Sequence, residues 1–497
     1  MIRRDFFRAS LAVAGLSLRQ DPVSSLLDTE QPFPNAPGLT KYVSAFIVNT
    51  KYEDIPADVI ALGKKSLLDA FGLALCGAAS PISSLVWKYA QMSGVSGGKA
   101  TVMGTGMKAP LRFAAFANGV SIHANDFDDT QLAAEKDRVY GKLVHPTVTV
   151  LPPAFALSEL GRCSGKELLL AYHVGVEVET KIVEAISPRH YNDGFHSTGT
   201  CGSFGSAAAC AKLRHLDALK TAYALGIVAA EAGGLNENLG SMTKPFQAGH
   251  AAENGTVAAD LASLGWTAAD NILEAPAGYF HAAGGGFDNG LIMNRLGKPW
   301  TFATPGISIK PFPCGSLAHP AMGEFLRLIR ENKIRAAYVE KIDIGGNHSM
   351  TTTLLDHHPM NGLQGKFSME FCLSILLLDG KAGLGQFTDA VVQRPDVQDM
   401  IRRVNFYVDP EAESAGFDKM TSLLKIHLKS GKIISGRAEF AKGSPANPMS
   451  YEEVIEKFMG NAEFAKWPAQ KSKAIVEAVK SLENQADTSG LSVALAS

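Results

Sequence analysis

Residues 202–213 read GSFGSAAACAKL, and this run of small side chains decides the fold class. Small and apolar residues recur there at the three- and four-residue spacing of a helix. Because small side chains let helix axes approach closely, we expect this helix at the buried centre of a helical domain. No strand is predicted before Gly202 and Gly205, so the pair does not indicate a dinucleotide-binding loop.

The same helical spacing recurs through the first half of the chain. Apolar residues repeat every three or four positions in residues 57–76, 109–125, 165–186 and 216–232. We therefore predict an all-helical domain over residues 31–304.

The pattern changes after residue 305. Apolar and polar residues alternate in residues 339–344 and 404–408, which predicts strands. Residues 424–428 and 433–438 form a further pair, joined by a plausible hairpin turn at 429–432. These features predict a smaller α+β lid domain over residues 305–443.

Helical spacing returns in residues 444–497, where Ser450 and Glu453 have the spacing of a capping box. We expect these C-terminal helices to pack back onto the helical domain. The predicted fold class is therefore mainly α, a large all-helical domain plus a smaller α+β lid domain.

The composition limits the classes of function. A chain of 497 residues with 46% hydrophobic and 19% charged residues should fold, with more than one core. Lys and Arg total 47 against 49 for Asp and Glu, so no nucleic acid partner is indicated. The six cysteines contain no C-x-x-C pair, which disfavours structural zinc and favours packing roles.

The N-terminus carries a targeting pattern. Residues 3–8 read RRDFFR and precede a short apolar run over residues 11–18, which resembles a twin-arginine export signal. We expect residues 1–30 to engage the twin-arginine export machinery and to direct the protein to the periplasm. The alternative is a frayed amphipathic N-terminus on a cytoplasmic protein. No later apolar run approaches the ~20 residues of a spanning helix, so no membrane association is predicted after signal removal.

The densest polar cluster is HANDFDDT at residues 123–130, followed by His145-Pro146. Its three carboxylates can cap helix ends in a solvated loop. They can also bind a divalent cation, or orient a histidine that transfers protons. These interpretations stay open on the residues alone.

A second cluster, GFHSTGT at residues 194–200, comes directly before the small-residue helix. Helix N-termini bind anions, and His196 would act there as a general acid or base. The alternative is an ordinary Ser/Thr cap beside a surface histidine.

Two lysines lie in stiff, apolar surroundings. Lys244 belongs to SMTKPFQAGH at residues 241–250, and Lys310 belongs to ISIKPFPCG at residues 307–315. A fixed ammonium group is a good partner for a substrate carboxylate. A structural ion pair is the alternative.

Taken together, these segments resemble the MmgE/PrpD family, which includes 2-methylcitrate dehydratase, cis-aconitate decarboxylase and iminodisuccinate epimerase. The resemblance implies a helical domain, a smaller lid domain, a homodimer and an active site in the cleft between the domains. By motif, the residues that line this cleft are Asp126, Thr130, His145, His196, Lys244 and Lys310. The motifs that carry the resemblance are 68–72, 123–130 with 145–146, 194–196, the two lysine segments, 366–368 and 447–450.

The chain departs from the family pattern at several positions. Gly315 stands where the decarboxylase pattern has a histidine, and Phe371 aligns with a tyrosine. Gln247 replaces a frequent histidine in the Lys244 segment, and the fourteen residues from Gln131 to Val144 form a longer loop. The absence of the histidine at 315 and of the tyrosine at 371 removes two groups that could transfer protons, which weighs against cis-aconitate decarboxylation.

The resemblance and the residues together predict a lyase of the dehydratase type that needs no metal and no cofactor. Its substrate would be a small di- or tricarboxylic acid, such as a 2-methylcitrate-like acid. We assign acid–base roles to His145 and His196, orientation of a histidine to Asp126, and substrate binding to Thr130, Lys244 and Lys310. The alternatives are an epimerase, a decarboxylase of a related acid, and an exported carboxylate-binding protein without catalysis.

Overall fold

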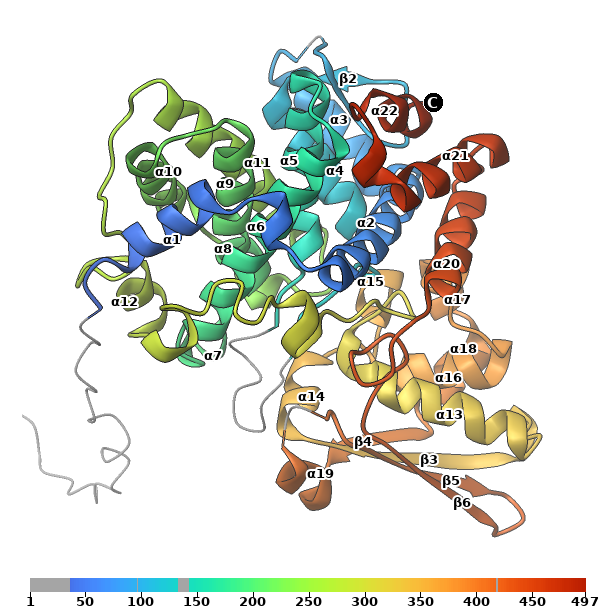
Figure 1. Ribbon diagram of the computed structural model, residues 1–497. Helices are drawn as coiled ribbons and strands as arrows, with labels where there is room; N and C mark the ends of the chain where they lie inside the picture. The colour runs from blue at the N-terminus through green and yellow to red at the C-terminus, as the bar shows by residue number, and fades with distance from the viewer. Residues whose placement is uncertain (1–35, 96, 133–142, 417–418) are drawn as a thin grey trace, which may run out of the picture. The chain divides into compact units, whose positions relative to one another are not determined.

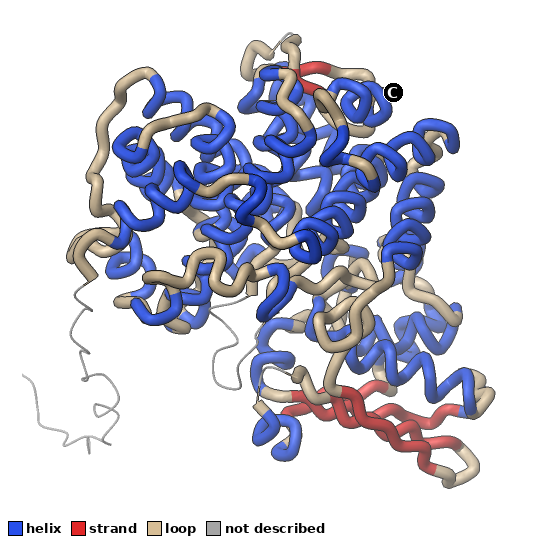
Figure 2. Tube along the Cα trace, viewed as in Figure 1, coloured by secondary structure: helices blue, strands red, loops and turns tan. Residues whose placement is uncertain are grey.

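The computed structural model describes residues 36–95, 97–132, 143–416 and 419–497, so the predicted signal segment lies outside the described residues. Helices dominate and strands are few (Figure 2), which confirms the mainly α fold class with a smaller α+β part. The helices of the first half are α1 (Leu39–Asn49), α2 (Ala57–Ala78), α3 (Pro81–Met92), α4 (Leu111–His123), α5 (Pro146–Gly161), α6 (Gly165–Ala185), α7 (Arg189–Asn192), α8 (Ser197–Thr200), α9 (Gly202–Leu213), α10 (Ala218–Glu231), α11 (Thr243–Ser263) and α12 (Tyr279–Gly284).

The predicted small-residue helix is α9, which packs against α5, α6, α10 and α11 (Figure 1). Its small residues are required by the close approach of these helices. A Cβ atom added at Gly205 would lie 2.6 Å from Oε2 of Glu179 and 2.9 Å from the carbonyl oxygen of Gly175 on α6. The expectation of a buried central helix is therefore confirmed.

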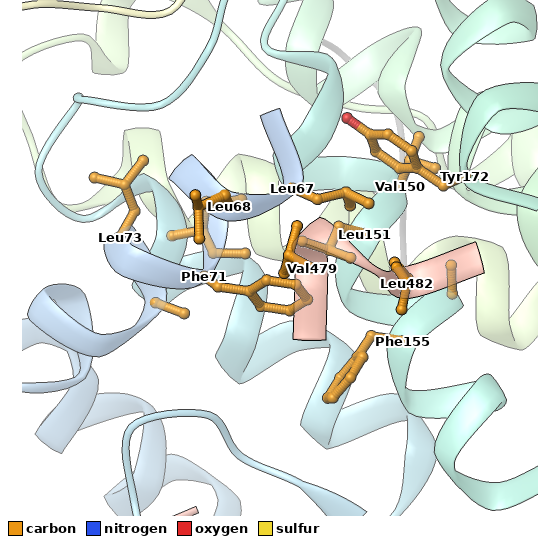
Figure 3. Packing of buried hydrophobic residues seen from close by; sticks show 14 of the residues in the cluster. Leu67, Leu68, Phe71, Leu73, Val150, Leu151, Phe155, Tyr172, Val479 and Leu482 are labelled. Atoms are coloured by element: carbon orange, nitrogen blue, oxygen red, sulfur yellow. The ribbon is translucent and has the colours of Figure 1, made fainter. Parts of the chain in front are cut away.

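The C-terminal helices complete the helical core, as the sequence predicts. These are α20 (Tyr451–Phe464), α21 (Ala469–Lys480) and α22 (Ser489–Leu495), and the capping box of Ser450 and Glu453 opens α20. α20 packs along α2. Figure 3 shows Val479 beside Phe71 of α2 and Leu482 near Leu151 and Phe155 of α5, all within one buried cluster.

A four-stranded sheet forms the second part of the fold. The strands are β3 (Val339–Gly346), β4 (Val404–Val408), β5 (Ser422–Leu428) and β6 (Ile433–Ala438), in the order β4-β3-β5-β6. β3 and β4 are parallel, and the other two neighbouring pairs are antiparallel. The predicted strands and the hairpin between β5 and β6 are thereby confirmed.

Helices α13 (His319–Glu331) and α16 (Met369–Asp379) lie along one face of this sheet (Figure 1). Ile342 and Ile344 of β3 point into the core that they share with Phe325 of α13, whereas Lys341 is exposed. This alternation is what the sequence of the strand predicts. The remaining α-helices are α14 (His348–Thr353), α15 (Gly362–Gly365), α17 (Asp389–Val392), α18 (Pro395–Ile401) and α19 (Pro410–Ala415), and β1 (Ala100–Thr101) pairs with β2 (Lys108–Ala109).

The buried apolar residues form two large clusters. One joins residues 55–309 with 454–495, and the other covers residues 314–434. The domain boundaries at residues 304 and 443 stay predictions. Among the described residues, no single helix has the length and apolarity to cross a membrane; only α2 and α3 taken together reach that threshold, across a bend of 77°.

Candidate active site

A cavity of about 40 Å³ lies where the loop after α4, the first turn of α11 and the segment after residue 306 meet. All six residues predicted for the site contribute to its wall, and the roles assigned to them stay predictions. The wall consists of Asp126, Thr130, Leu143, His145, Tyr191, His196, Leu239, Lys244, Lys310, Gly315, Ser316, Leu317, Thr353 and Phe367. Basic side chains therefore converge on a space that can hold a few water molecules.

Asp126 reaches this cavity because the chain turns sharply after α4. Its φ is 50°, in the left-handed region that Asp tolerates, and its amide donates to the carbonyl oxygen of His123 at 3.0 Å. Its carboxylate contacts the ammonium groups of Lys244 and Lys310, the latter at 3.1 Å. Burial alone would raise the pKa of Asp126, but the two ammonium groups outweigh it and hold the pKa well below its usual range.

The lysines are fixed by backbone carbonyl groups as well as by this carboxylate. Lys310 Nζ donates to the carbonyl oxygens of Asp126 at 3.0 Å and Cys314 at 3.1 Å. Lys366, which the sequence analysis did not select, donates to the carbonyl oxygens of Asn125 and of Pro313. Burial lowers the pKa of Lys366 to about 8. Lys310 and Lys366 thus hold the turn at Asn125 and Asp126 by hydrogen bonds to its backbone carbonyl groups.

Asp128 makes the closest carboxylate contacts with the histidines. Nδ1 of His123 lies 2.9 Å from both oxygens of Asp128, and Nδ1 of His145 lies 3.3 Å from one of them. In contrast, Oδ1 of Asp126 lies 4.0 Å from Nε2 of His145. The orienting role that we predicted for Asp126 is therefore better supported at Asp128.

His145 is held in one orientation at the start of α5. Its Nδ1 lies 2.9 Å from the carbonyl oxygen of Asp129, which can only accept a hydrogen bond, so this nitrogen carries a proton. Its amide donates to Oγ1 of Thr198 at 3.2 Å. Burial lowers the pKa of His145 to about 4, against the opposing effect of Asp128. His145 is thus a neutral imidazole whose Nε2 carries the lone pair.

His196 directly precedes α8, and its Nδ1 lies 2.6 Å from Oε1 of Gln247. Burial holds its pKa well below the usual range, and the neighbouring Lys244 acts in the same direction. The anion site expected before α9 stays a prediction. In this segment the amides of Gly199 and Thr200 donate to the carbonyl oxygen of His196.

Thr130 connects the loop after α4 to the segment before Lys310. Thr130 and Ser308 exchange two backbone hydrogen bonds of 2.8 Å, and the hydroxyl of Thr130 lies 3.2 Å from that of Ser316. Gln131 and Val144 pair in the same way and close the long loop, whose residues 133–142 lie outside the described part of the chain. The substrate-binding role of Thr130 stays a prediction.

Two buried carboxyl groups, those of Asp129 and Asp69, help to fix the loop after α4. Asp129 accepts hydrogen bonds from the hydroxyl of Thr147 at 2.6 Å and from its amide at 3.3 Å, and burial raises its pKa to about 7. Lys457 of α20 lies 2.8 Å from Asp69 and donates to the carbonyl oxygen of Phe127 at 2.8 Å. The C-terminal helices therefore reach the site loop directly.

The two departures from the decarboxylase pattern have different surroundings. Gly315 lines the cavity, and a Cβ atom there would lie 2.8 Å from Cδ2 of Leu354. Phe371 is fully buried in the core of the α+β part, where its ring packs edge-on against Phe387. Neither residue supplies a proton-transferring group to the cavity.

One group of described side chains has the geometry to approach a metal ion, namely His123, Asp128 and His145, whose ligand atoms lie within 4.8 Å of one another. A nitrogen that carries a proton has no lone pair for a metal, and Nδ1 of His145 carries one because it donates to the Asp129 carbonyl. Nδ1 of His123 is likewise a donor, because the carboxylate of Asp128 only accepts hydrogen bonds. This set fits a hydrogen-bonded triad better than a metal centre.

The sequence analysis missed four residues that shape the site: His123, Asp128, Gln247 and Lys366. His123 and Asp128 belong to the quoted HANDFDDT motif, but spacing alone does not show which carboxylate faces which histidine. Gln247 appeared only as a departure from the family pattern. Lys366 belongs to a motif of the resemblance, and its position in an apolar segment was a usable signal.

The fold and the cavity define a mainly helical protein with a smaller α+β part and a buried cluster of histidines and lysines. Residues 41–291 match the MmgE/PrpD N-terminal domain, and residues 312–483 match the MmgE/PrpD C-terminal domain. The chain belongs to the MmgE/PrpD family, which confirms the resemblance found in the sequence.

The similarity to known relatives covers most of the chain. The cis-aconitate decarboxylase of Homo sapiens is 28% identical over 471 residues, which cover 92% of this chain and 94% of the relative. The protein of the same name in Mus musculus is 27% identical, with 91% and 92% covered. The cis-aconitate decarboxylase of Aspergillus terreus is 29% identical over 449 residues, with 85% and 88% covered.

Proposed function

We propose that the chain is a metal-independent lyase that acts on a small di- or tricarboxylic acid by acid–base proton transfer. The observation that carries this proposal is the one cavity wall shared by His145, His196, Lys244 and Lys310. Histidine is the most common side chain in proton transfer near neutral pH, and a fixed ammonium group pairs with a carboxylate. The family membership and the names of the relatives agree with this class of reaction.

The charges of the cluster favour an anionic substrate. Lys244, Lys310 and Lys366 bring three ammonium groups, whereas Asp126 and Asp128 bring two carboxylates. All five groups are buried, so their interactions are screened less than those on the surface. One carboxylate of a substrate would neutralise the third ammonium group.

Dehydration is the reaction that these residues support best. One histidine takes the proton from a carbon next to a carboxylate, and the electron pair of that C–H bond forms the double bond. The C–O bond on the neighbouring carbon breaks, and the second histidine gives its proton to the oxygen, which leaves as water. Each positioned acid or base typically contributes ~10²–10⁴ to the rate. A 2-methylcitrate-like acid has the required hydroxyl and carboxylates.

A second candidate is decarboxylation of an acid related to cis-aconitate, because the relatives above carry that name. In this reaction the bond to a carboxylate carbon breaks, carbon dioxide leaves, and an acid protonates the carbon. The cavity has Gly315 where the decarboxylase pattern has a histidine, and this difference weighs against decarboxylation.

The test is proton NMR in heavy water of the purified full chain with citrate-, methylcitrate-, aconitate- and aspartate-like acids. Vinylic signals formed from a hydroxy acid support the dehydratase, and loss of carbon dioxide from an aconitate-like acid supports the decarboxylase. Exchange without a product supports an epimerase. Silence across the panel contradicts the enzyme proposal and leaves the carboxylate-binding protein.

Two histidine variants, one in the cavity and one on the surface, test whether the cavity carries the activity. We expect His196→Ala to lower turnover by ~10²-fold or more while the folded structure is retained. His358→Ala changes an exposed histidine and should leave turnover unchanged. Normal turnover in His196→Ala would refute the assignment.

We also propose that residues 1–30 act as a twin-arginine export signal, and that the mature protein is a periplasmic homodimer. The paired Arg3 and Arg4 before an apolar run support the first part. A reporter that is active only after export, fused behind residues 1–40, should lose activity when both arginines become lysine. Light scattering should give twice the mass of one chain. Equal activity of the arginine and lysine fusions would contradict the twin-arginine route, and no activity in the unaltered fusion would favour the cytoplasmic alternative.

A further inference from the structure

We propose that Gln247 is a positioning residue that holds His196 in one tautomer, with the proton on Nδ1 and a free lone pair on Nε2. This inference rests on the proposed function, because it makes His196 the base that removes the substrate proton. The motifs alone leave the order of the two histidines open.

The orientation of the Gln247 amide follows from its second partner. Nε2 of Gln247 donates to the backbone carbonyl oxygen of Leu235 at 3.0 Å. A carbonyl oxygen only accepts hydrogen bonds, so a reversed amide would place two acceptors against each other. Gln247 is buried on α11, and Gly199 and Gly234 pack against its side chain. Its Oε1 therefore faces His196.

The tautomer of His196 follows from this orientation. Nδ1 of His196 lies 2.6 Å from Oε1 of Gln247, and an amide oxygen only accepts, so Nδ1 must carry the proton. A neutral imidazole has a single N–H group, which leaves a lone pair on Nε2. His196 lines the cavity, and within the described part of the chain its Nε2 makes no hydrogen bond. The lone pair is thus available to a substrate.

The charged surroundings distinguish the two histidines. The titratable groups that face His196 are Lys244 of α11, His123 of α4 and His145 before α5, and all three disfavour a positive charge on its ring. His145, in contrast, faces the carboxylates of both Asp126 and Asp128. His196 is therefore suited to start the cycle as the neutral base.

The first test is the pH profile of kcat/KM for Gln247→Glu. A carboxylate next to Nδ1 stabilises the imidazolium form of His196, so the rising limb should move to higher pH by about 1–2 units. Gln247→Met keeps the size of the side chain and removes the acceptor, and we expect kcat to fall by ~10–100-fold. Gln91→Glu, an exposed glutamine, is the matched control. A rising limb that stays in place in Gln247→Glu would overturn the proposal.

The second test needs no substrate. In the full chain with ¹⁵N-labelled histidine, the signal that disappears in His196→Asn should show a protonated Nδ1 and an unprotonated Nε2. The opposite tautomer overturns the proposal. A chain that shows the expected tautomer but converts no acid would contradict the proposed function while keeping the positioning role, so the two failures are distinguishable.

Discussion

Lys310 holds Asp126 at two points, because its Nζ donates to the backbone carbonyl at 3.0 Å and lies 3.1 Å from the carboxylate oxygen Oδ1. Lys310 belongs to the segment that leads into the α+β part, whereas Asp126 follows α4 of the helical part. The contact therefore joins the two parts at the cavity. It also places a cation where a substrate carboxylate would bind.

Lys310→Met should lower kcat/KM by ~10–100-fold, because a hydrogen bond to a charged group is worth about 1.5–3 kcal/mol. Lys244 still pairs with Asp126 in this variant, so the fold should persist. Steady-state kinetics and circular dichroism provide the measurement. Lys381→Met, at an exposed position of the α+β part, is the control and should change neither. An unaltered kcat/KM in Lys310→Met would exclude Lys310 from substrate binding.

Asp129→Asn should stabilise the protein relative to wild type as the pH rises. Burial raises the pKa of Asp129 from 3.8 to about 7, so between these values the folded state binds more protons than the unfolded state. The wild type therefore loses stability as the pH rises through this window, by up to about 4 kcal/mol. Asparagine does not titrate, so the variant should not show this loss of stability as the pH rises. Chemical unfolding at several pH values from 4 to 8 is the measurement.

Asp128→Asn is the matched comparison, because the pKa of Asp128 is shifted in the opposite direction. Burial would raise this pKa, but His123 and His145 hold it well below its usual range. The stabilisation by Asp128 is therefore present at neutral pH and lost as the pH falls. Parallel pH dependence in the two variants would contradict the assigned directions.

The sequence predicted the elements well because their signals are local. Helical spacing, strand alternation and the Ser450–Glu453 capping box each extend over a few residues, and the structure confirms them. The six residues at the cavity could also be predicted, because they lie in short motifs and the resemblance to the family assigns these motifs to one cleft.

The support of the site could not be predicted because it comes from distant parts of the chain. Lys366 bonds to Asn125 across 241 positions, and Lys457 bonds to Phe127 across 330 positions. The turn at Asp126 depends on a left-handed backbone, and it decides that Asp126 meets the lysines while Asp128 meets the histidines. No spacing rule encodes that choice.

Lys457→Met should destabilise the protein by about 3–5 kcal/mol, because it leaves the buried carboxyl group of Asp69 without its cation. The ammonium group also lies 3.8 Å from the ring centroid of Phe127, so the site loop should loosen as well. Denaturant unfolding gives the free energy. Lys473→Met, exposed on α21, is the control. Adding Asp69→Asn should recover part of the loss, and no recovery would argue against the pairing.

Gly255→Ala tests the close packing that the GSFGSAAACAKL stretch predicts. A Cβ atom at Gly255 on α11 would lie 2.3 Å from the backbone carbonyl carbon of Ser206 and 2.5 Å from the amide nitrogen of Ala207, so α9 and α11 would have to separate. We expect a loss of about 3 kcal/mol or more in the free energy of unfolding.

Gly460→Ala is the matched control, because this glycine lies in α20 with no atom within 4 Å of the added Cβ. Alanine restricts the unfolded chain and favours a helix, so this variant should gain about 0.4–1 kcal/mol. The same chemical change should therefore act with opposite sign at the two positions. Similar effects in both variants would mean that the helix interface of α9 can relax, and that small residues there are not required by the approach of α11.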